Sequence, residues 1–268
     1  MKKFINIVRK PNLVKIITIN SFGHLIEVLQ TTEYCCGHAV FRGVTDSINH
    51  KLIPSIGRLA EYLDTDLDTL RSHEREVLNL FRHKAYGELQ KIPPNNWIWL
   101  ALAQHHGLPT RFLDWTFSPL VAAYFATEPS LSHDGKLMPL PTNGGAIYIL
   151  HDCNYLDAYN PQKTNEDPFI FTEHRIVYSP VITNRIAGQA GLFTIHKDPR
   201  LEFQEGFEDE FGARWIHKLI FNKEVSEEIQ KTLYFLGIRK GSIYPDIDGF
   251  ANDTKIRFAI SDCHTEAC

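Results

Sequence analysis

Residues 104–126 have the sequence QHHGLPTRFLDWTFSPLVAAYFA, and this stretch decides how the chain is interpreted. It crowds an amide, two imidazoles, a guanidinium, a carboxylate and several hydroxyls onto a predicted turn, a short strand and the start of a helix. Burying such groups without partners costs about 2–7 kcal/mol each. The polar groups therefore either satisfy one another or face a ligand.

Capping and turn residues predict the helices and the strand in and around this stretch. Asn96 is a candidate N-cap for a helix that Gly107 and Pro109 end. Residues 111–115 form a predicted short strand. Ser118-Pro119 then starts a helix that runs to about Thr127, because proline is tolerated in the first helical turn.

Apolar periodicity and turn residues predict the rest of the chain. Strands are expected within 11–20 and at 39–43, 145–150, 174–178, 191–196 and 213–221. Helices are expected from Ser21 to Gln30, over 70–90, from Ser226 to Gly237 and after the turn at Tyr244-Pro245-Asp246, with a surface loop over 128–143. This order predicts an α+β fold with a largely antiparallel sheet core and helices segregated in the N-terminal half.

The composition excludes several classes of protein. A chain of 268 residues that is 43% hydrophobic is long enough to fold without disulfide or metal support. A net charge of -4 argues against a broad nucleic-acid footprint. Five irregularly spaced cysteines, no signal peptide and no apolar run of about 20 residues predict a cytoplasmic protein without membrane contact.

The standard cofactor and metal motifs are missing from the sequence. It contains no Gly-rich dinucleotide fingerprint, no P-loop and no Gly-x-Ser-x-Gly elbow. Val77 stands where a zinc protease of the pattern begun at His73-Glu74 needs its second histidine. Neighbouring His105 and His106 point to different faces of a helix, so we predict no metal site.

Several segments together resemble the FRG domain, a bacterial family named for its Phe-Arg-Gly motif. The first is Phe41-Arg42-Gly43, followed by Leu52-Ile53-Pro54-Ser55-Ile56-Gly57-Arg58, and the second is residues 104–126. Weaker echoes occur at 185–194 and at Tyr244-Pro245-Asp246-Ile247-Asp248-Gly249. The resemblance implies a single FRG domain over 1–268, with its core at about 20–255.

A second, weaker resemblance links the chain to ADP-ribosyltransferases. These enzymes place an arginine on a first core strand beside an aromatic residue and glycine, as Phe41-Arg42-Gly43 does. Their next strand and the helix after it are similar to Leu113-Asp114-Trp115-Thr116 and Ala122-Ala123-Tyr124-Phe125-Ala126. The catalytic glutamate of a late strand is not matched, since Gln189 stands in its place and neither Glu173 nor Glu202 lies in a motif.

The resemblance implies an ADP-ribosyltransferase-like fold that uses NAD as its substrate. Arg42 would hold phosphate or ribose, Asp114 would stabilise the cationic sugar, and Thr116 would contact the nicotinamide ribose. Gln189 can bind but cannot act as a base. Further nucleotide-binding positions are expected at Phe41, Gly43, Arg58, Gln104, His105, His106, Arg111, Trp115 and Phe193.

Structural roles compete with these assignments. Arg42 can form a buried bridge with Asp114, and Asp114 can cap the next helix or hold Arg111. Gln104, His105 and His106 can satisfy the end of their helix, and Thr116 can cap the next one. Trp115 suits a core or pocket wall, and Gln189 suits a buried amide.

Three functions therefore remain open. The first is NAD cleavage or ADP-ribosyl transfer to a macromolecular acceptor, which family context connects with bacterial toxins or phage defence. The second is a module that senses a nucleotide without turning it over. The third is a hydrolase or nuclease in which His105 or His106 works with Asp114.

Overall fold

The computed structural model describes residues 15–31, 34, 39–151, 155–157, 166–172, 174–178, 188–203 and 215–265. The described strands are β1 Lys15–Thr18, β2 Ala39–Val44, β3 Phe112–Thr116, β4 Ala146–His151, β5 Tyr155–Asp157, β6 Arg175–Tyr178, β7 Gly191–Ile195 and β8 Trp215–Ile220. The described helices are α1 Phe22–Leu29, α2 Ser55–Leu63, α3 Leu67–Ala85, α4 Asn96–His105, α5 Pro119–Ala126, α7 Lys223–Phe235, α8 Lys240–Ile243 and α9 Ile247–Thr265, with short 3-10 turns at Tyr86–Glu88 and Pro168–Ile170.

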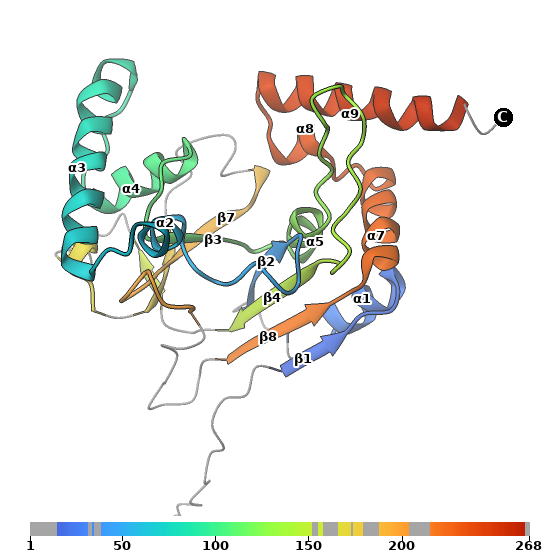
Figure 1. The fold of residues 1–268 in the computed structure, drawn as a ribbon, viewed down its shortest axis with the longest axis horizontal. Coiled ribbons are helices and arrows are strands. Elements are labelled where there is room, and N and C mark those ends of the chain that lie inside the picture. Colours follow the sequence, from blue (N-terminus) through green and yellow to red (C-terminus); the bar gives the residue numbers. More distant parts are fainter. Residues whose placement is uncertain are drawn as a thin grey trace, which may run out of the picture.

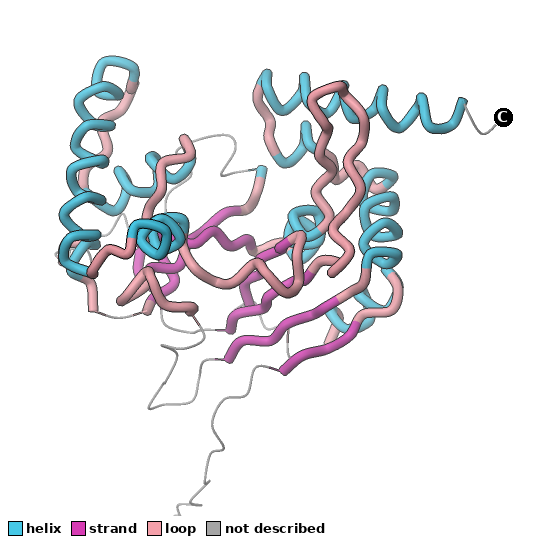
Figure 2. Tube along the Cα trace, viewed as in Figure 1, coloured by secondary structure: helices cyan, strands magenta, loops and turns pink. Residues whose placement is uncertain are grey.

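The strands of the described residues form one sheet in the order β1-β8-β4-β2-β3-β7-β6-β5. The pairs β1–β8 and β5–β6 are parallel and the other pairs are antiparallel. Figures 1 and 2 show α3 and α4 at one end of this sheet and α1 and α7 at the other. The predicted α+β fold with a largely antiparallel sheet is confirmed.

The placement of the helices is only partly as predicted. Among the described elements, α7, α8 and α9 follow β8, so helices are not confined to the N-terminal half. Figure 1 shows the long α9 running along one edge of the molecule and past α7. Among the described residues, no helix is both long enough and apolar enough to cross a membrane.

Side chains that alternate along the strands divide the core between the two faces of the sheet. Phe41 and Ile149 pack on one face with α1, α5 and α7, and Phe112 and Phe193 continue that face toward α4. Val40, Trp115 and Leu150 lie on the opposite face, and Leu52 and Phe203 pack against them from two connecting loops. The two strands nearest the middle of the sheet, β2 and β3, carry the two strongest sequence motifs.

Capping residues explain most helix boundaries. The predicted caps Ser21 and Ser118 are confirmed, because Ser21 Oγ accepts from His24 N at 3.1 Å and Ser118 Oγ accepts from Val121 N at 3.4 Å. Two predicted helix starts are wrong. The cap of α4 is Asn95 instead of Asn96, and α7 begins after Asn222, which accepts from Val225 N at 3.0 Å, and not at Ser226.

The predicted helix over 70–90 starts earlier than expected. Asp66 accepts from the amides of Asp68 and Thr69, so α3 begins at Leu67. The side chains that α3 buries are Leu70, Glu74 and Leu78, whereas Val77 is exposed. The buried face of α3 therefore includes a carboxylate, and Val77 lies off that face.

Candidate functional site

The sheet opens between its two central strands. Among the described residues, β2 and β3 register at one position, where Phe41 lies opposite Thr116. The next residue of β2 is Arg42, and its Nη1 donates to the backbone carbonyl of Asp114 at 2.7 Å. An arginine side chain thus replaces the ladder hydrogen bond that the diverging strands no longer make.

The two charged side chains at this opening are close but not tightly paired. Arg42 Nη1 lies 3.9 Å from Asp114 Oδ2, and 58% of the Asp114 side chain is exposed, compared with 21% for Arg42. The Nε of Arg42 is buried and has no hydrogen-bond partner in the part of the chain that the structure describes. Burial lowers the pKa of the Arg42 guanidinium, while Asp114 opposes this shift and Arg58 adds to it. The opening therefore presents an incompletely satisfied cation beside a solvent-facing carboxylate.

Gln104 holds the Asp114 carboxylate from the end of α4. Its Nε2 donates to Asp114 Oδ2 at 2.9 Å, and its Oε1 accepts from Thr110 Oγ1 at 2.6 Å. Thr110 Oγ1 in turn accepts from the amide of Phe112 at 3.1 Å. These bonds fix both the amide orientation of Gln104 and the position of the carboxylate.

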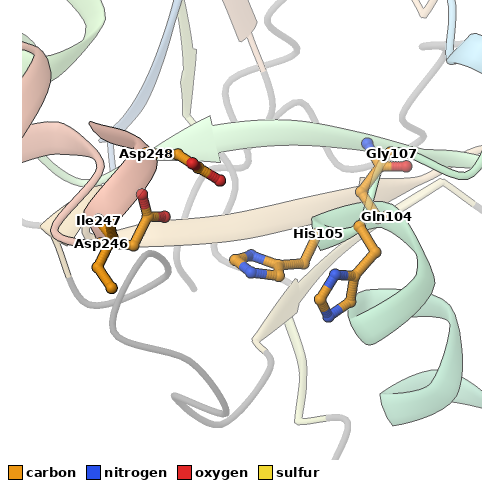
Figure 3. A pocket seen from close by; sticks show the side chains of 7 residues that line it. Gln104, His105, Gly107, Asp246, Ile247 and Asp248 are labelled. Atoms are coloured by element: carbon orange, nitrogen blue, oxygen red, sulfur yellow. The ribbon is translucent and has the colours of Figure 1, made fainter. Parts of the chain in front are cut away.

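A cleft of about 690 Å³ adjoins this group through Gln104. One wall is the end of α4, with His105, His106 and Gly107, and the other is the start of α9, with Asp246, Ile247 and Asp248. Figure 3 shows the two aspartates facing the His105 side across the open space. The ring centroids of His105 and His106 are 4.9 Å apart and perpendicular. The cleft therefore combines imidazoles, carboxylates and an amide within one concave surface.

The far wall is built by a tight turn before α9. The Oδ1 of Asp246 accepts from the amide of Gly249 at 2.7 Å, which confirms the predicted turn into the last helix. A Cβ on Gly249 would lie 1.8 Å from the carbonyl oxygen of Tyr244, so glycine is required for this close approach. The two residues between them, Ile247 and Asp248, are thereby turned outward beside the cleft.

Thr116 and Gln189 come together, but through bonds within the protein. Thr116 Oγ1 donates to the backbone carbonyl of Gln189 at 2.6 Å and accepts from Ser118 N at 3.0 Å. The side chain of Thr116 is buried. Its hydroxyl proton is thus used to connect the end of β3 with the turn before β7, as the predicted cap at the strand-to-helix junction requires.

Three other expected contact residues lie inside the core. Arg111 is fully buried, and its Nη2 lies 2.7 Å from Glu74 Oε2. Trp115 is 3% exposed and donates its Nε1 to Thr194 Oγ1 at 3.0 Å. Phe193 stacks on Phe112 with ring centroids 5.1 Å apart. None of the three faces the cleft, so we assign them to packing and internal pairing.

Phe41 and Gly43 likewise face the helix behind the strand. Phe41 is 4% exposed in the core beside α5. A Cβ on Gly43 would lie 1.8 Å from the carbonyl oxygen of Ala122, so this glycine allows α5 to pack directly on β2. Of the Phe-Arg-Gly motif, only the arginine is aimed at the opening.

Arg58 and several residues that sequence reasoning did not select surround Arg42 on its own face of the sheet. Arg58 is exposed on α2 and donates from Nη1 to the carbonyl of Ile53 at 2.5 Å. Burial raises the pKa of Tyr148 to about 12, with a further contribution from Glu202 and an opposing one from Arg42. Lys218 Nζ lies 4.8 Å from the Tyr148 ring centroid. No motif marks these residues, since they are brought together by strand pairing.

The two carboxylates that the sequence left open differ in what the structure shows. Glu202 Oε1 lies 3.5 Å from the amide of Leu52, over the face of the sheet opposite to Asp114. Glu173 lies outside the described residues. Within the described ranges, no group of three or more histidines, cysteines, aspartates or glutamates is arranged to hold a metal ion.

Comparison with known proteins gives one family match. Residues 37–135 match the family model of the FRG domain, and this range includes both Arg42 and Asp114. No curated protein and no solved structure matches the chain. The matched range ends well before α9, so it contains the opening between β2 and β3 but only one wall of the cleft.

Proposed function

We propose that this chain, whose residues 37–135 match the FRG domain, binds NAD or a related nucleotide at Arg42 and Asp114 and cleaves it or transfers its ADP-ribosyl group. The observation that carries the proposal is the opening between β2 and β3. There a partly satisfied guanidinium lies 3.9 Å from an exposed carboxylate. The weaker likeness to ADP-ribosyltransferases supplies the reaction type.

Arg42 is suited to hold the pyrophosphate. Guanidinium groups bind phosphate oxygens through their N–H donors, and Arg42, which uses Nη1 for a carbonyl, keeps 21% of its side chain exposed. Exposed Arg58 is close enough to lower the pKa of Arg42. Two adjacent cations favour a ligand with two negative charges.

Asp114 is suited to stabilise the sugar cation. Breaking the bond between nicotinamide and C1′ of its ribose sends the electron pair to nicotinamide and leaves positive charge on the sugar, as in glycoside cleavage. A nearby carboxylate lowers the energy of that state. Water or a macromolecular nucleophile then bonds to C1′ and releases a proton, so hydrolysis gives nicotinamide, ADP-ribose and a proton. Gln104 keeps the carboxylate aimed during this step.

The residues around this pair have supporting roles in the proposal. Thr116 fixes the end of β3 instead of contacting the ribose, because both of its hydroxyl bonds are internal. The cleft lined by His105 and Asp248 is the route by which an acceptor reaches C1′. A toxin or phage-defence role in a bacterial cytoplasm fits such chemistry.

Nicotinamide release from NAD by the purified protein is the direct test. We expect release by the native chain and at least a hundredfold less by Asp114→Asn, which keeps the shape of the side chain but removes its charge, with about the same loss for Arg42→Lys. Asp134→Asn is the matched control, because Asp134 is an exposed aspartate in the 128–143 loop. Thermal unfolding of each variant shows whether lost activity reflects lost folding.

The other outcomes separate the alternatives. If no nicotinamide is released but NAD raises the melting temperature of the native chain and not of Arg42→Lys, the protein is a nucleotide sensor. If neither occurs, nucleotide binding at Arg42 is ruled out.

The cleft favours a second candidate, a hydrolase or nuclease with His105 or His106 as general base. Asp246 and Asp248 face His105 across the cleft that His106 also lines, whereas Asp114 is engaged by Gln104. This function is identified if hydrolase or nuclease activity is lost in His105→Ala or in His106→Ala, and also in Asp248→Asn, while Asp114→Asn stays active. Full activity in both histidine variants excludes it.

A further inference from the structure

Helix α9 carries apolar side chains on two opposite faces. Ile256 is 4% exposed and, with buried Gly249, marks the face that packs against the molecule. Ile247, Phe250 and Phe258 are 84%, 54% and 69% exposed. Steps of three and four residues connect these three through exposed Thr254, so they form one stripe. Thr254 and Phe258 each lie two residues from Ile256, which places the stripe on the opposite side of the helix.

This stripe is unusual for a surface helix. Single exposed apolar residues are common, but a run of large ones at helical spacing marks a surface that meets another molecule. A helix with apolar residues on both faces is normally buried on both. Figure 1 shows α9 extending along the edge of the molecule. We therefore expect the outer stripe to bind another molecule.

We propose that the occupant is α9 of a second copy of this chain, packed in the antiparallel direction. The charges beside the stripe point to this occupant. Exposed Asp248 and Lys255 lie on the same flank, two helical turns apart, one toward each end of the stripe. Antiparallel pairing brings each Asp248 next to Lys255 of the second copy, which gives two symmetric ion pairs. Parallel pairing instead puts this flank of each copy on opposite sides of the contact, so neither ion pair forms.

The apolar side chains fit the same arrangement. Ile247 begins the stripe and Phe258 ends it, so antiparallel pairing sets the Ile247 of each copy against the Phe258 of the other. Phe250 and Thr254 then occupy the middle of the contact. The stripe is self-complementary, as a two-fold interface requires.

The proposed interface reaches the cleft. Ile247 and Asp248 line the cleft and also belong to the stripe and its flank. The second copy of α9 therefore passes the mouth of the cleft and narrows the access to it. Self-association in this way governs which acceptors or ligands enter, whatever reaction the site performs.

The size of the contact sets the expected affinity. Three large side chains over three helical turns bury less than the roughly 1,200 Å² of a standard stable interface. We therefore expect a reversible dimer with a dissociation constant on the order of micromolar. Sedimentation velocity of the full chain from about 1 to about 100 µM covers that range.

Charge reversal tests the pairing directly. Asp248→Lys alone and Lys255→Asp alone should each weaken self-association about tenfold, because two attractive pairs become repulsive. The double variant Asp248→Lys/Lys255→Asp should restore it. Phe258→Ser should abolish it, while Phe235→Ser is the matched control, since Phe235 is 86% exposed but lies at the end of α7, off the stripe.

Two results would overturn the proposal. One is a native chain that stays monomeric over the whole concentration range, in which case α9 does not pair with itself. The other is a dimer that both reversals and Phe258→Ser leave unchanged, which would place the interface elsewhere. Because Asp248 lies in the first turn of α9 and its reversal can weaken the helix itself, Lys255→Asp provides the independent arm.

Discussion

Arg42 donates a 2.7 Å hydrogen bond to the backbone carbonyl of Asp114, directly after Phe41, which pairs with Thr116 between β2 and β3. The bond joins two motifs that lie 72 residues apart in the sequence. It gives the arginine a structural task at the opening of the sheet, yet leaves its Nε without a partner among the described residues. The same side chain thus stabilises the fold and, in the proposed function, also presents its charge to a nucleotide.

The first prediction concerns that bond. Arg42→Ala leaves the carbonyl of Asp114 without its donor, so we expect the free energy of unfolding to fall by about 1–3 kcal/mol. Arg42→Lys keeps a charged donor at this position and should lose less than half as much. Urea denaturation measures both. No loss in Arg42→Ala would mean that the hydrogen bond to Asp114 adds nothing to stability.

The second prediction concerns Gly43. The added Cβ of Gly43→Ala would lie 1.8 Å from the carbonyl oxygen of Ala122 and 2.6 Å from the amide nitrogen of Ala126, so α5 must move away from β2. We expect the free energy of unfolding to fall by about 3 kcal/mol or more. Gly87→Ala is the control, because a Cβ added there would meet nothing within 4 Å, and it should change stability by less than about 0.5 kcal/mol. A Gly43→Ala protein as stable as this control would contradict the packing described.

The third prediction concerns the buried pair of Glu74 and Arg111. Both side chains are essentially inaccessible, at 1% and 0% exposure. Glu74→Leu leaves a buried guanidinium uncompensated and should cost about 3–5 kcal/mol, whereas Glu74→Leu/Arg111→Met should recover most of that loss. Denaturation of the single and double variants gives the coupling energy. Additive losses would show that the two charges act independently.

The fourth prediction concerns His196 and pH. Burial lowers the pKa of His196 well below its usual value, and His174, Arg42 and Arg111 add to the shift. In the unfolded chain a histidine titrates near about pH 6.5. Below that pH the histidine binds a proton in the unfolded state but not in the folded state. The contribution of His196 to stability is therefore fully present above about pH 6.5 and falls as the pH drops toward the folded pKa.

The measurement is the free energy of unfolding at about pH 7.5 and about pH 5.5. The native chain should lose on the order of 1 kcal/mol through His196. His196→Gln should reduce this pH dependence even if its overall stability is lower, because the ring also packs on Phe203 with centroids 4.7 Å apart. His133→Gln, at an exposed position, should leave the slope unchanged. An unchanged slope in His196→Gln would refute the assignment.

Local signals in the sequence were enough for most elements. Ser21 and Ser118 predicted two helix starts, and apolar runs predicted β2, β4, β6, β7 and β8. The predicted helix starts were wrong where two residues could each act as the N-cap, as at Asn95 and Asn96 or at Asn222 and Ser226. α2 was not predicted, because it is only nine residues long and its N-cap residue, Pro54, makes no side-chain hydrogen bond.

The sequence by itself determined the α+β class, the FRG motifs and the concentration of polar groups in residues 104–126. Only the tertiary structure decided which of those groups are satisfied internally and which face outward. Arg111 forms an ion pair with Glu74, and Thr116 donates to the backbone carbonyl of Gln189. Asp114 remains exposed beside Arg42. The physical reason is that each partner comes from a segment far away in the chain, brought near by strand pairing and helix packing that no local spacing encodes.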